Sequence, residues 1–301
     1  MAWPLGLRCD AIYPLEHTLP FASYEIRRMT RGHLSTAICW AAREGWNPGL
    51  HDLDPFHGID PEGFFMGWLG ERPVASIACV RYGDSHGFIG FYMVEPTLRR
   101  HGLGLALWNA ALDRVKGRVV GLDGVVAQQD NYRRSGFELA WYNVRYKGWG
   151  RESVAQDRRV VSIASLPFER LAAYDRPFHP VARPVFLQAW VQMPQSHALG
   201  WWEGGELRGY GVMRACQEGY KLAPLCADTP AIAEALFEAL CARVRKDEPV
   251  FMDVPECNLL ATRLALSQGM DATFPTARMY RGPAPQLALS RLYGLTTLEV
   301  G

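Results

Sequence analysis

The chain has 301 residues, of which 49% are hydrophobic and 21% are charged, a composition typical of a globular protein with a substantial core. At about 100–200 residues per domain, this length favours two domains. Lys and Arg number 32 against 31 Asp and Glu, a net charge of +1, so the basic excess of proteins that bind nucleic acid is missing.

The first 22 residues are expected to form an irregular leader. They contain Pro4, Pro14 and Pro20, and no long apolar run of the kind found in secretory signals. No stretch of the chain approaches the ~20 apolar residues of a membrane span. The seven cysteines are scattered without a C-x-x-C motif, which favours reduced thiols and a cytoplasmic protein without structural zinc.

The first half of the chain alternates strand and helix patterns in the manner of an α/β unit. Turn residues at 45–49, 70–73 and 83–87 separate the patterns. In chain order we expect a strand at 24–29, a helix at 31–44, a loop to about 63, a hairpin of strands at 64–69 and 74–82, a strand at 88–94, a helix at 102–116, a strand at 118–125, a short helix at 130–135 and a strand at 141–149.

The second half repeats this order after a polar stretch. We expect a helix at 181–193, a hairpin at 200–216, a strand at 220–226, a helix at 229–245, a strand at 249–255, a helix at 258–268 and a strand at 277–282. Gly136 corresponds to Gly269, and 145–148 to 279–282, so duplication explains the order. The predicted division is a leader at 1–22, a first domain at 23–149, a linker at 150–160, a second domain at 161–290 and a tail at 291–301.

The turn after the strand at 88–94 is the strongest functional signal in the chain. It reads Val94-Glu95-Pro96-Thr97-Leu98-Arg99-Arg100-His101-Gly102-Leu103-Gly104 and opens a helix. Glycines let the backbone fold closely around a ligand, and the amides and dipole of a helix N-terminus favour an anion. The three basic residues add positive charge, so the segment suits a diphosphate. An ordinary strand–loop–helix corner is the alternative.

The pattern Val-x-Pro-x-x-Arg-x-x-Gly-x-Gly resembles the acetyl-CoA loop of the GNAT superfamily of N-acetyltransferases. The resemblance covers about 24–148 and implies an α/β (α+β) fold of two tandem GNAT-type domains, each with a mixed, mostly antiparallel sheet flanked by helices. It implies that the strand end parts from its neighbour and pairs with acetyl-CoA, with an N–H near Val94 stabilising the oxyanion. The implied coenzyme contacts are Tyr92, Met93, Val94, Arg99, Arg100, His101, Gly102, Leu103, Gly104 and Asn131.

The resemblance also assigns a catalytic residue. Tyr132 stands four residues before Gly136-Phe137, where the family has its general acid, and would protonate the departing thiolate. A packed helix tyrosine is the structural alternative. The family often has an asparagine seven residues before this tyrosine; here that position is Val125, and Asn131 lies beside the tyrosine instead.

The loop at 46–57 is the predicted acceptor wall. Trp46, Asp52 and Phe56 would give a mixed aromatic and acidic surface suited to an amine, with Asp52 as a candidate base. A solvated loop with turn residues explains the same composition. His51 and His57 flank this stretch, but we expect no metal site.

The second repeat lacks the coenzyme turn. Residues 227–232 contain neither glycine nor arginine, and the tyrosine position is Ala265. Asn258 occupies the family's asparagine position. This order is similar to a bacterial group of two-domain GNAT proteins with a degenerate C-terminal domain. We infer that the second domain shapes the acceptor site or replaces the partner of a homodimer.

The expected activity is acetyl-CoA-dependent transfer of an acetyl group to the primary amine of a small molecule by direct attack. An acyl-CoA-binding regulator or pseudoenzyme, and a protein or peptide N-acetyltransferase, stay open as alternatives. We expect a monomer or homodimer that binds neither nucleic acid nor membrane.

Overall fold

The computed structural model describes residues 23–152 and 157–301, so the predicted leader and the middle of the predicted linker lie outside the described residues. The first half contains β1 (Tyr24–Arg28), α1 (Arg31–Arg43), α2 (Leu53–Ile59), β2 (Phe64–Leu69), β3 (Arg72–Tyr82), β4 (His86–Val94), α3 (Leu103–Arg114), β5 (Val119–Val125), α4 (Gln129–Arg134) and β6 (Glu138–Trp149). The second half contains β7 (Val160–Ser162), α5 (Phe168–Asp175), α6 (Pro184–Val191), β8 (Ser196–Glu203), β9 (Glu206–Ala215), β10 (Tyr220–Ala227), α7 (Pro230–Cys241), β11 (Pro249–Pro255), α8 (Leu259–Ser267), β12 (Asp271–Arg281) and β13 (Leu292–Gly294).

The strands of both halves form one continuous sheet. Its order is β1-β2-β3-β4-β5-β12-β6-β11-β10-β9-β8-β7, and β13 pairs with β10. The parallel pairs are β4 with β5 and β10 with β11; the other pairs are antiparallel. Each half therefore has the mixed, mostly antiparallel sheet that was predicted.

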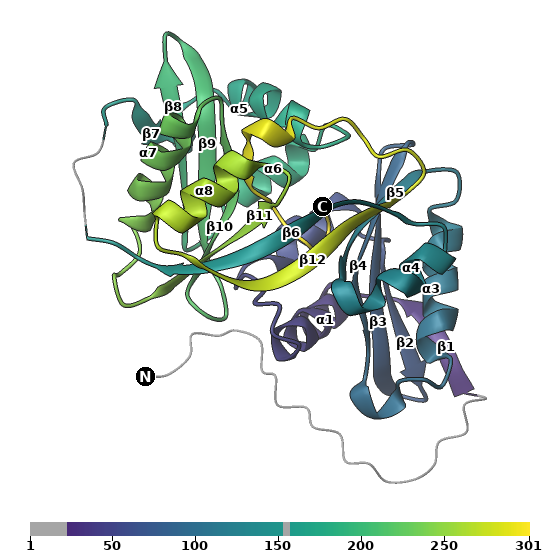
Figure 1. Cartoon of the computed structure of the whole chain (residues 1–301). Helices are drawn as coiled ribbons and strands as arrows, with labels where there is room; N and C mark the ends of the chain where they lie inside the picture. The colour runs from purple at the N-terminus through teal and green to yellow at the C-terminus, as the bar shows by residue number, and fades with distance from the viewer. Residues whose placement is uncertain (1–22, 153–156) are drawn as a thin grey trace.

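β6 of the first half and β12 of the second half each pair with strands of the other half. In Figure 1, β6 and β12 cross the middle of the molecule between the two halves. β6 pairs with β11, and β12 pairs with β5 and β6. The order of elements along the chain gives no sign of this exchange. The repeat predicts the same strands in the same order whether each strand pairs within its own half or with the other half.

Two buried ion pairs lie at equivalent positions of the exchanged strands. Arg145 of β6 lies opposite Asp253 of β11, with Nε–Oδ1 and Nη2–Oδ2 distances of 2.7 and 2.9 Å. Arg278 of β12 lies opposite Asp123 of β5, with corresponding distances of 2.7 and 2.5 Å. Both are bidentate, and each compensates a charge that is costly to leave alone in the interior. The exchange is thus fixed by side chains as well as by backbone pairing.

The helices divide between the two faces of the sheet. On one face, α3 packs on β3 and β4, and α7 packs on β9 and β10. On the other face, α1, α2, α5 and α6 contribute to one apolar core shared by both halves. Phe56 of α2 stacks on Trp190 of α6 with 6.0 Å between ring centroids, which joins the halves directly.

Three sequence-based expectations need correction. The stretch at 46–63 is not all loop, because 53–59 forms α2 and buries Phe56. The second half has an additional helix, α5, before the expected one, which is shorter than predicted and spans Pro184–Val191. The tail at 291–301 is not peripheral: it contains β13 and continues through the interior, where Thr297 and Val300 are buried. The helices α2 and α5 and the buried course of the C-terminal residues depend on tertiary packing, which local sequence patterns do not reveal.

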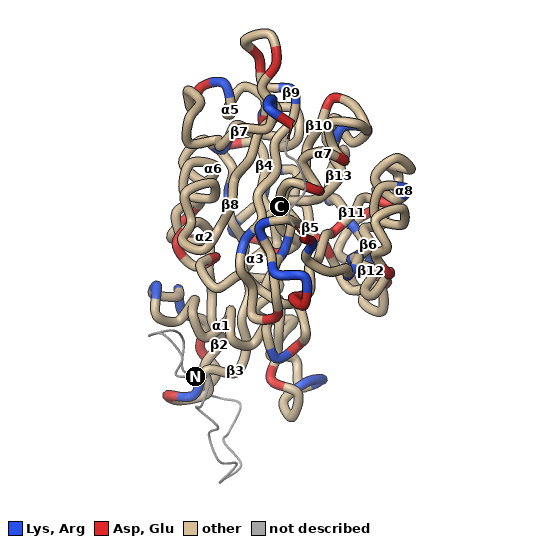
Figure 2. The backbone as a smooth tube through the Cα atoms, turned by 90° about the vertical axis from the view of Figure 1, so that its left-hand side faces the viewer, with Lys and Arg blue, Asp and Glu red and all other residues tan. Residues whose placement is uncertain are grey.

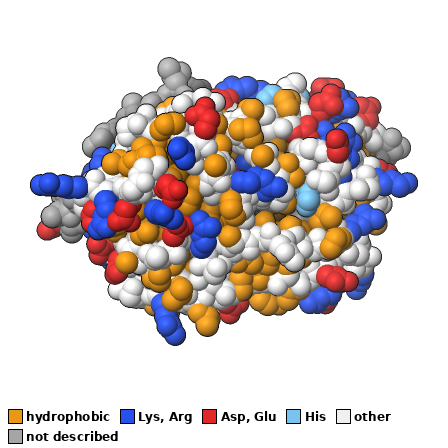
Figure 3. Space-filling view, turned by 90° about the horizontal axis from the view of Figure 1, so that it is seen from above, with side chains coloured by type: hydrophobic (Ala, Val, Ile, Leu, Met, Phe, Trp, Pro, Cys, Tyr) orange, Lys and Arg blue, Asp and Glu red, His pale blue; other side chains and the backbone are white. Residues whose placement is uncertain are grey.

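Charged residues are spread over the molecule. Figure 2 shows Lys and Arg interspersed with Asp and Glu, without a continuous basic stripe, and Figure 3 shows hydrophobic side chains interrupted by charged ones on the face seen from above. None of the described helices combines the length and apolarity needed to cross a membrane.

Candidate active site

The paired strands β4 and β5 part halfway along their length. Their parallel pairing runs from His86–Val119 to Ile89–Leu122 and then stops. Just beyond that point β4 has a bulge against β3, where Phe91 adopts a φ of +48° and its carbonyl accepts a hydrogen bond from Ser76 Oγ at 2.8 Å. The predicted separation of the strand end from its neighbour is confirmed. The result is a V-shaped gap in which β4 beyond Ile89 has no strand paired to it on the β5 side.

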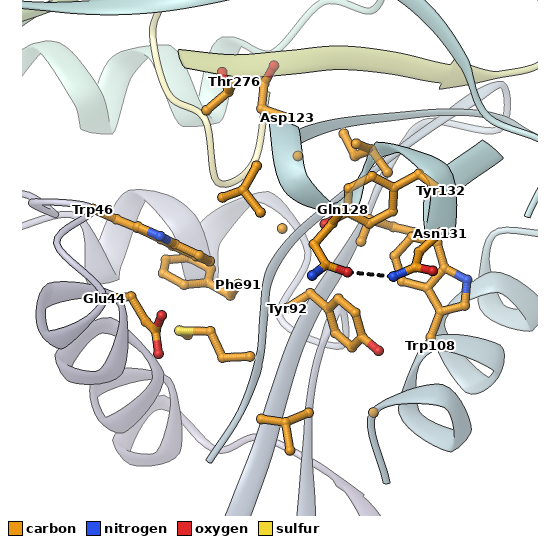
Figure 4. Close-up of a pocket in the computed structure, with 18 of the residues that line it drawn as sticks. Glu44, Trp46, Phe91, Tyr92, Trp108, Asp123, Gln128, Asn131, Tyr132 and Thr276 are labelled. Carbon is orange, nitrogen blue, oxygen red and sulfur yellow. Dashed lines mark hydrogen bonds between the residues drawn. The ribbon is translucent and has the colours of Figure 1, made fainter. Parts of the chain in front are cut away.

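A cavity of about 710 Å³ fills this gap and extends to the second half of the chain. Figure 4 shows Glu44 and Trp46 on one side and Tyr132, Asn131 and Trp108 on the other, with Phe91 and Tyr92 of β4 between them. Lining residues that the sequence analysis did not single out include Glu44, Ile89, Gly90, Phe91, Leu105, Trp108, Leu122, Asp123, Gly124, Gln128, Arg145, Phe274, Thr276, Leu298 and Glu299.

The glycine turn lies at the open end of the gap. Gly102 is the N-cap of α3 with a φ of +84°, in the left-handed region that favours glycine, and Arg100 before it has a φ of +70°. A Cβ on Gly104 would lie 2.7 Å from Tyr92 Oη and 2.9 Å from Val94 Cγ2. Glycine therefore lets α3 approach β4, and the first turn of the helix, whose amides have no intrahelical acceptors, lines the cavity through Gly102, Gly104 and Leu105.

The basic residues of the turn differ in their contacts. Arg99 donates from Nε to the Val94 carbonyl at 2.9 Å and from Nη2 to Glu44 at 2.5 Å, so it braces the end of β4 against α1. Arg99 and Arg100 line the cavity, whereas exposed His101 does not. The Leu103 side chain is buried with Leu69 and Val74, so only its backbone faces the turn. Arg99 thus has a structural contact that the sequence pattern does not reveal.

Tyr132 is held against the other strand of the gap. Its ring covers Gly124 of β5, where a Cβ would lie 2.2 Å from Cε2. Trp108 packs beside it at 5.5 Å between centroids and is itself fixed by a 3.0 Å hydrogen bond from Nε1 to Ser135. Burial raises the pKa of Tyr132 above the ordinary tyrosine value, and the nearby Tyr92 hydroxyl adds to the rise. The phenol therefore keeps its proton at neutral pH and can act as an acid.

Asn131 lies at the rim beside Tyr132. Its Nδ2 donates to Gln128 Oε1 at 2.6 Å, the contact drawn in Figure 4, and its Oδ1 accepts from Arg134 at 3.3 Å. Both Asn131 and Gln128 line the cavity. Tyr92, Met93 and Val94, which the sequence predicts as coenzyme contacts, line it from β4.

The predicted acceptor residues separate in the structure. Trp46 lines the cavity, but Asp52 and Phe56 do not. Asp52 is fully buried, accepts a 2.7 Å hydrogen bond from the Gly49 amide and pairs with Arg214 at 3.1 Å. Phe56 lies in the core behind Phe91. Assigning these two residues to the acceptor wall is therefore corrected: α2 turns both into the interior.

Residues of the second half complete the wall of the cavity. Phe274 and Thr276 reach the cavity from β12, and Leu298 and Glu299 from the C-terminal segment. Sequence reasoning missed them because they are 140 or more positions from Tyr132 in the chain. One signal was present: Asp123 and Asp253 are lone acids in matching apolar strands, which indicates buried partners.

Three charged groups of the wall have partners of opposite charge. Glu44 pairs with Arg99, Asp123 with Arg278, and Arg145 with Asp253. Burial raises the pKa of Asp123 despite the guanidinium beside it. Within 23–152 and 157–301 there is no group of three or more His, Cys, Asp or Glu side chains placed to share a metal ion.

The equivalent gap in the second half is occupied by the chain itself. β10 and β11 pair only at Tyr220–Val250 and Lys221–Phe251. Beyond this, β13 pairs with β10, and the Leu295 amide donates to the Asp253 carbonyl of β11 at 2.8 Å. A Cβ on Gly294 would lie 3.0 Å from Met252, so the segment fits closely.

Two residues at family positions hold this segment. Asn258 caps α8 and donates from Nδ2 to the Leu292 carbonyl at 2.9 Å. Asp228, in the turn that replaces the glycine turn, accepts from Arg291 at 2.6 Å. Thr229 caps α7 by accepting from the Ile232 amide. The second turn thus carries an acid that binds the chain's own arginine, where the first carries glycines and basic residues.

Comparisons with known proteins agree with this geometry. Residues 32–137 match the model of the acetyltransferase (GNAT) family, and residues 171–294 match a model of an acetyltransferase (GNAT) domain. The chain is 32% identical to holothin acyltransferase of Pseudoalteromonas sp. (strain SANK 73390) over 262 residues, covering 87% of this chain and 89% of that protein.

Two solved structures share the fold. A putative acetyltransferase from Pyrococcus horikoshii has a TM-score of 0.79 at 19% identity, over 96% of this chain and all of that one. A tandem GNAT protein from the clavulanic acid biosynthesis pathway has a TM-score of 0.60 at 14% identity, over 87% of this chain and 99% of that one. The tandem arrangement thus occurs in solved structures.

Proposed function

The chain belongs to the GNAT family of acyltransferases, and from this premise we propose that it transfers an acetyl group from acetyl-CoA to the primary amine of a small molecule by direct attack. The observation that carries the proposal is the V-shaped gap between β4 and β5, which leads from the glycine turn to Tyr132 in one cavity. A protein relative that is 32% identical is named as an acyltransferase of holothin, which supports a small-molecule acceptor.

The described residues fit acetyl-CoA. The amides at the start of α3 and exposed Arg100 suit its diphosphate, and the edge of β4 from Val94 to Phe91 suits the amides of its pantetheine arm. A side chain at Gly104 would collide with Tyr92 and Val94 and would push the helix away from β4. When bound, acetyl-CoA supplies the activated acyl group; the protein supplies position and charge.

The protein's own groups account for the transfer. Backbone amides at the β4 bulge would donate to the thioester oxygen as negative charge develops there; the structure has its irregular backbone at Phe91, three residues before Val94. The acceptor nitrogen forms its bond to the acyl carbon as the carbon–sulfur bond breaks. Tyr132 Oη gives its proton to the departing sulfur, whose pKa the same buried surroundings raise.

The acceptor enters from the side of Trp46, Phe274 and Thr276. These residues give an apolar wall with one hydroxyl, and the charged groups Glu44, Asp123 and Arg145 each have an opposite partner. We propose that the acceptor reacts as the free amine and gives its surplus proton to water, since arginines already engage the carboxylates of Glu44 and Asp123.

The test is calorimetric titration of acetyl-CoA followed by an amine panel scored by thiol release. We expect one binding site per chain, lost in the double variant Arg99→Glu/Gly102→Asp, and CoA release with at least one small amine. Tight binding without release from any small amine or peptide would instead support the regulator. Release from peptides alone would support a protein acetyltransferase, and no binding would overturn the proposal.

A further inference from the structure

The C-terminal segment 295–301 is fixed in the interior of the molecule. Tyr82 Oη donates to the Val300 carbonyl at 2.8 Å, and Arg183 Nη1 donates to the Gly301 carbonyl at 3.2 Å. The Val300 amide donates to Thr297 Oγ1 at 3.0 Å. Val300 is completely buried. The segment is therefore a built part of the fold, continuous with β13.

This segment crosses β4 where the gap begins. A Cβ on Gly90 would lie 1.9 Å from the Glu299 carbonyl oxygen, so glycine is required for the crossing. Gly90 follows Ile89, the last β4 residue paired with β5, and precedes Phe91 at the bulge. The crossing point is thus the closed end of the V. The C-terminal end, pale yellow in Figure 4, enters the same region.

The direction of a bound acyl-CoA follows from the two ends of the gap. Val94 lies at the open end, where Arg99 of the glycine turn contacts its carbonyl. Gly90 is four residues away along the strand, about 13 Å at ~3.3 Å per residue. A ligand with its diphosphate at the turn and its arm along β4 therefore brings its acyl group toward Gly90 and the C-terminal segment.

We propose that Leu298 forms the end wall of the acyl site and restricts the enzyme to short acyl groups. Leu298 lines the cavity and packs against the shared core, and Ile89, Phe91 and Leu122 line the same end. These four residues give the end wall apolar side chains, as a methyl group requires, next to Glu299, and the segment behind Leu298 is anchored at Val300 and Gly301. This proposal rests on the proposed function and adds which acyl-CoA donors the enzyme accepts.

The experiment measures the affinities of acetyl-, butyryl- and hexanoyl-CoA by calorimetry for the full-length wild type, Leu298→Ala and Leu289→Ala. Leu289 is the matched control, because it packs against the same core from the C-terminal end but does not line the cavity. Thermal unfolding of both variants reports their folding. The same proteins are then assayed for thiol release with the amine panel.

We expect the wild type to bind acetyl-CoA more tightly than hexanoyl-CoA, and Leu298→Ala to shift that ratio at least tenfold toward hexanoyl-CoA, the scale on which apolar pockets distinguish added methylenes. Leu289→Ala should leave the ratio unchanged.

An unchanged ratio in folded Leu298→Ala, or a wild type indifferent to chain length, overturns the inference while acyl transfer can persist. If Leu298→Ala does not fold, Leu298→Met replaces it; any shift in its ratio supports the inference, and an unchanged ratio overturns it. A shifted ratio without thiol release from any amine sustains the acyl wall but overturns the proposed transferase. Absence of acyl-CoA binding overturns both.

Discussion

The gap between β4 and β5 and the gap between β10 and β11 have the same origin and opposite contents. Each lies where two parallel strands part, and each is followed by a turn and a long helix. The first contains the cavity with Tyr132, and the second contains β13 and the anchor Asp228–Arg291. The difference teaches that this fold makes a gap between its parting parallel strands in each half, which stays open as a cavity in the first half and is filled by the chain itself in the second.

The same C-terminal segment connects the two gaps. β13, which directly precedes it, fills the second gap, and the segment itself closes the end of the first gap at Gly90. The second half therefore does more than support the first. Its C-terminal residues fill the gap of the second half and also close one end of the cavity in the first half.

The largest effect is expected for the acid of the open gap. Tyr132→Phe should lower kcat by about 10²–10⁴-fold, the usual contribution of a general acid, and leave acetyl-CoA affinity within about twofold. Steady-state kinetics and calorimetry measure the two quantities. Tyr293→Phe removes a hydroxyl from the filled gap and should leave both unchanged; equal turnover of Tyr132→Phe and wild type would contradict the assigned role.

The exchanged strands should depend equally on their two ion pairs. Asp123→Ala and Asp253→Ala each leave a buried guanidinium without its partner, which we expect to cost about 3–5 kcal/mol of unfolding free energy. Urea denaturation measures this. Asp157, which lies at the surface and is only partly buried, also bonds to an arginine, and Asp157→Ala should change stability little. A loss confined to one of the two buried carboxylates would show that the exchange is not symmetric in energy.

The turns of the two gaps should not be interchangeable. Gly102→Asp places a carboxylate at the helix N-terminus and a side chain at a φ of +84°, so acetyl-CoA affinity should fall at least tenfold. Asp228→Gly makes the second turn less acidic but leaves β13 in its gap, so the stoichiometry should stay at one site per chain. If calorimetry finds a second acetyl-CoA site in Asp228→Gly, then β13 does not keep the second gap closed to the coenzyme.

The smallest effect concerns pH. Because burial raises the pKa of Tyr132, its proton is lost only above the ordinary tyrosine value, so kcat/KM should show no loss from this group up to pH 10. A pH–rate profile between 7 and 10 checks this. An alkaline decline below pH 10 that is absent in Tyr132→Phe would mean that the phenol is more exposed than the structure shows.

Much of the open gap could be read from the sequence. The glycine turn, the helix it opens and Tyr132 before Gly136 are local patterns, and the structure brings them together at β4 and β5. The loss of the second turn was visible in the same way. Asp52 and Phe56 were misplaced because α2, which buries them, has the composition of a loop.

What the sequence alone determined is the set of features carried by neighbouring residues: two repeats, their strands and helices, one intact turn and its tyrosine. What only the tertiary structure decided depends on contacts between distant segments. The exchange of β6 and β12, the filling of the second gap by β13 and the closure of the first by Leu298 join residues more than 30 positions apart. Periodicity reports which face of an element is buried, and carries no information about which distant segment covers that face.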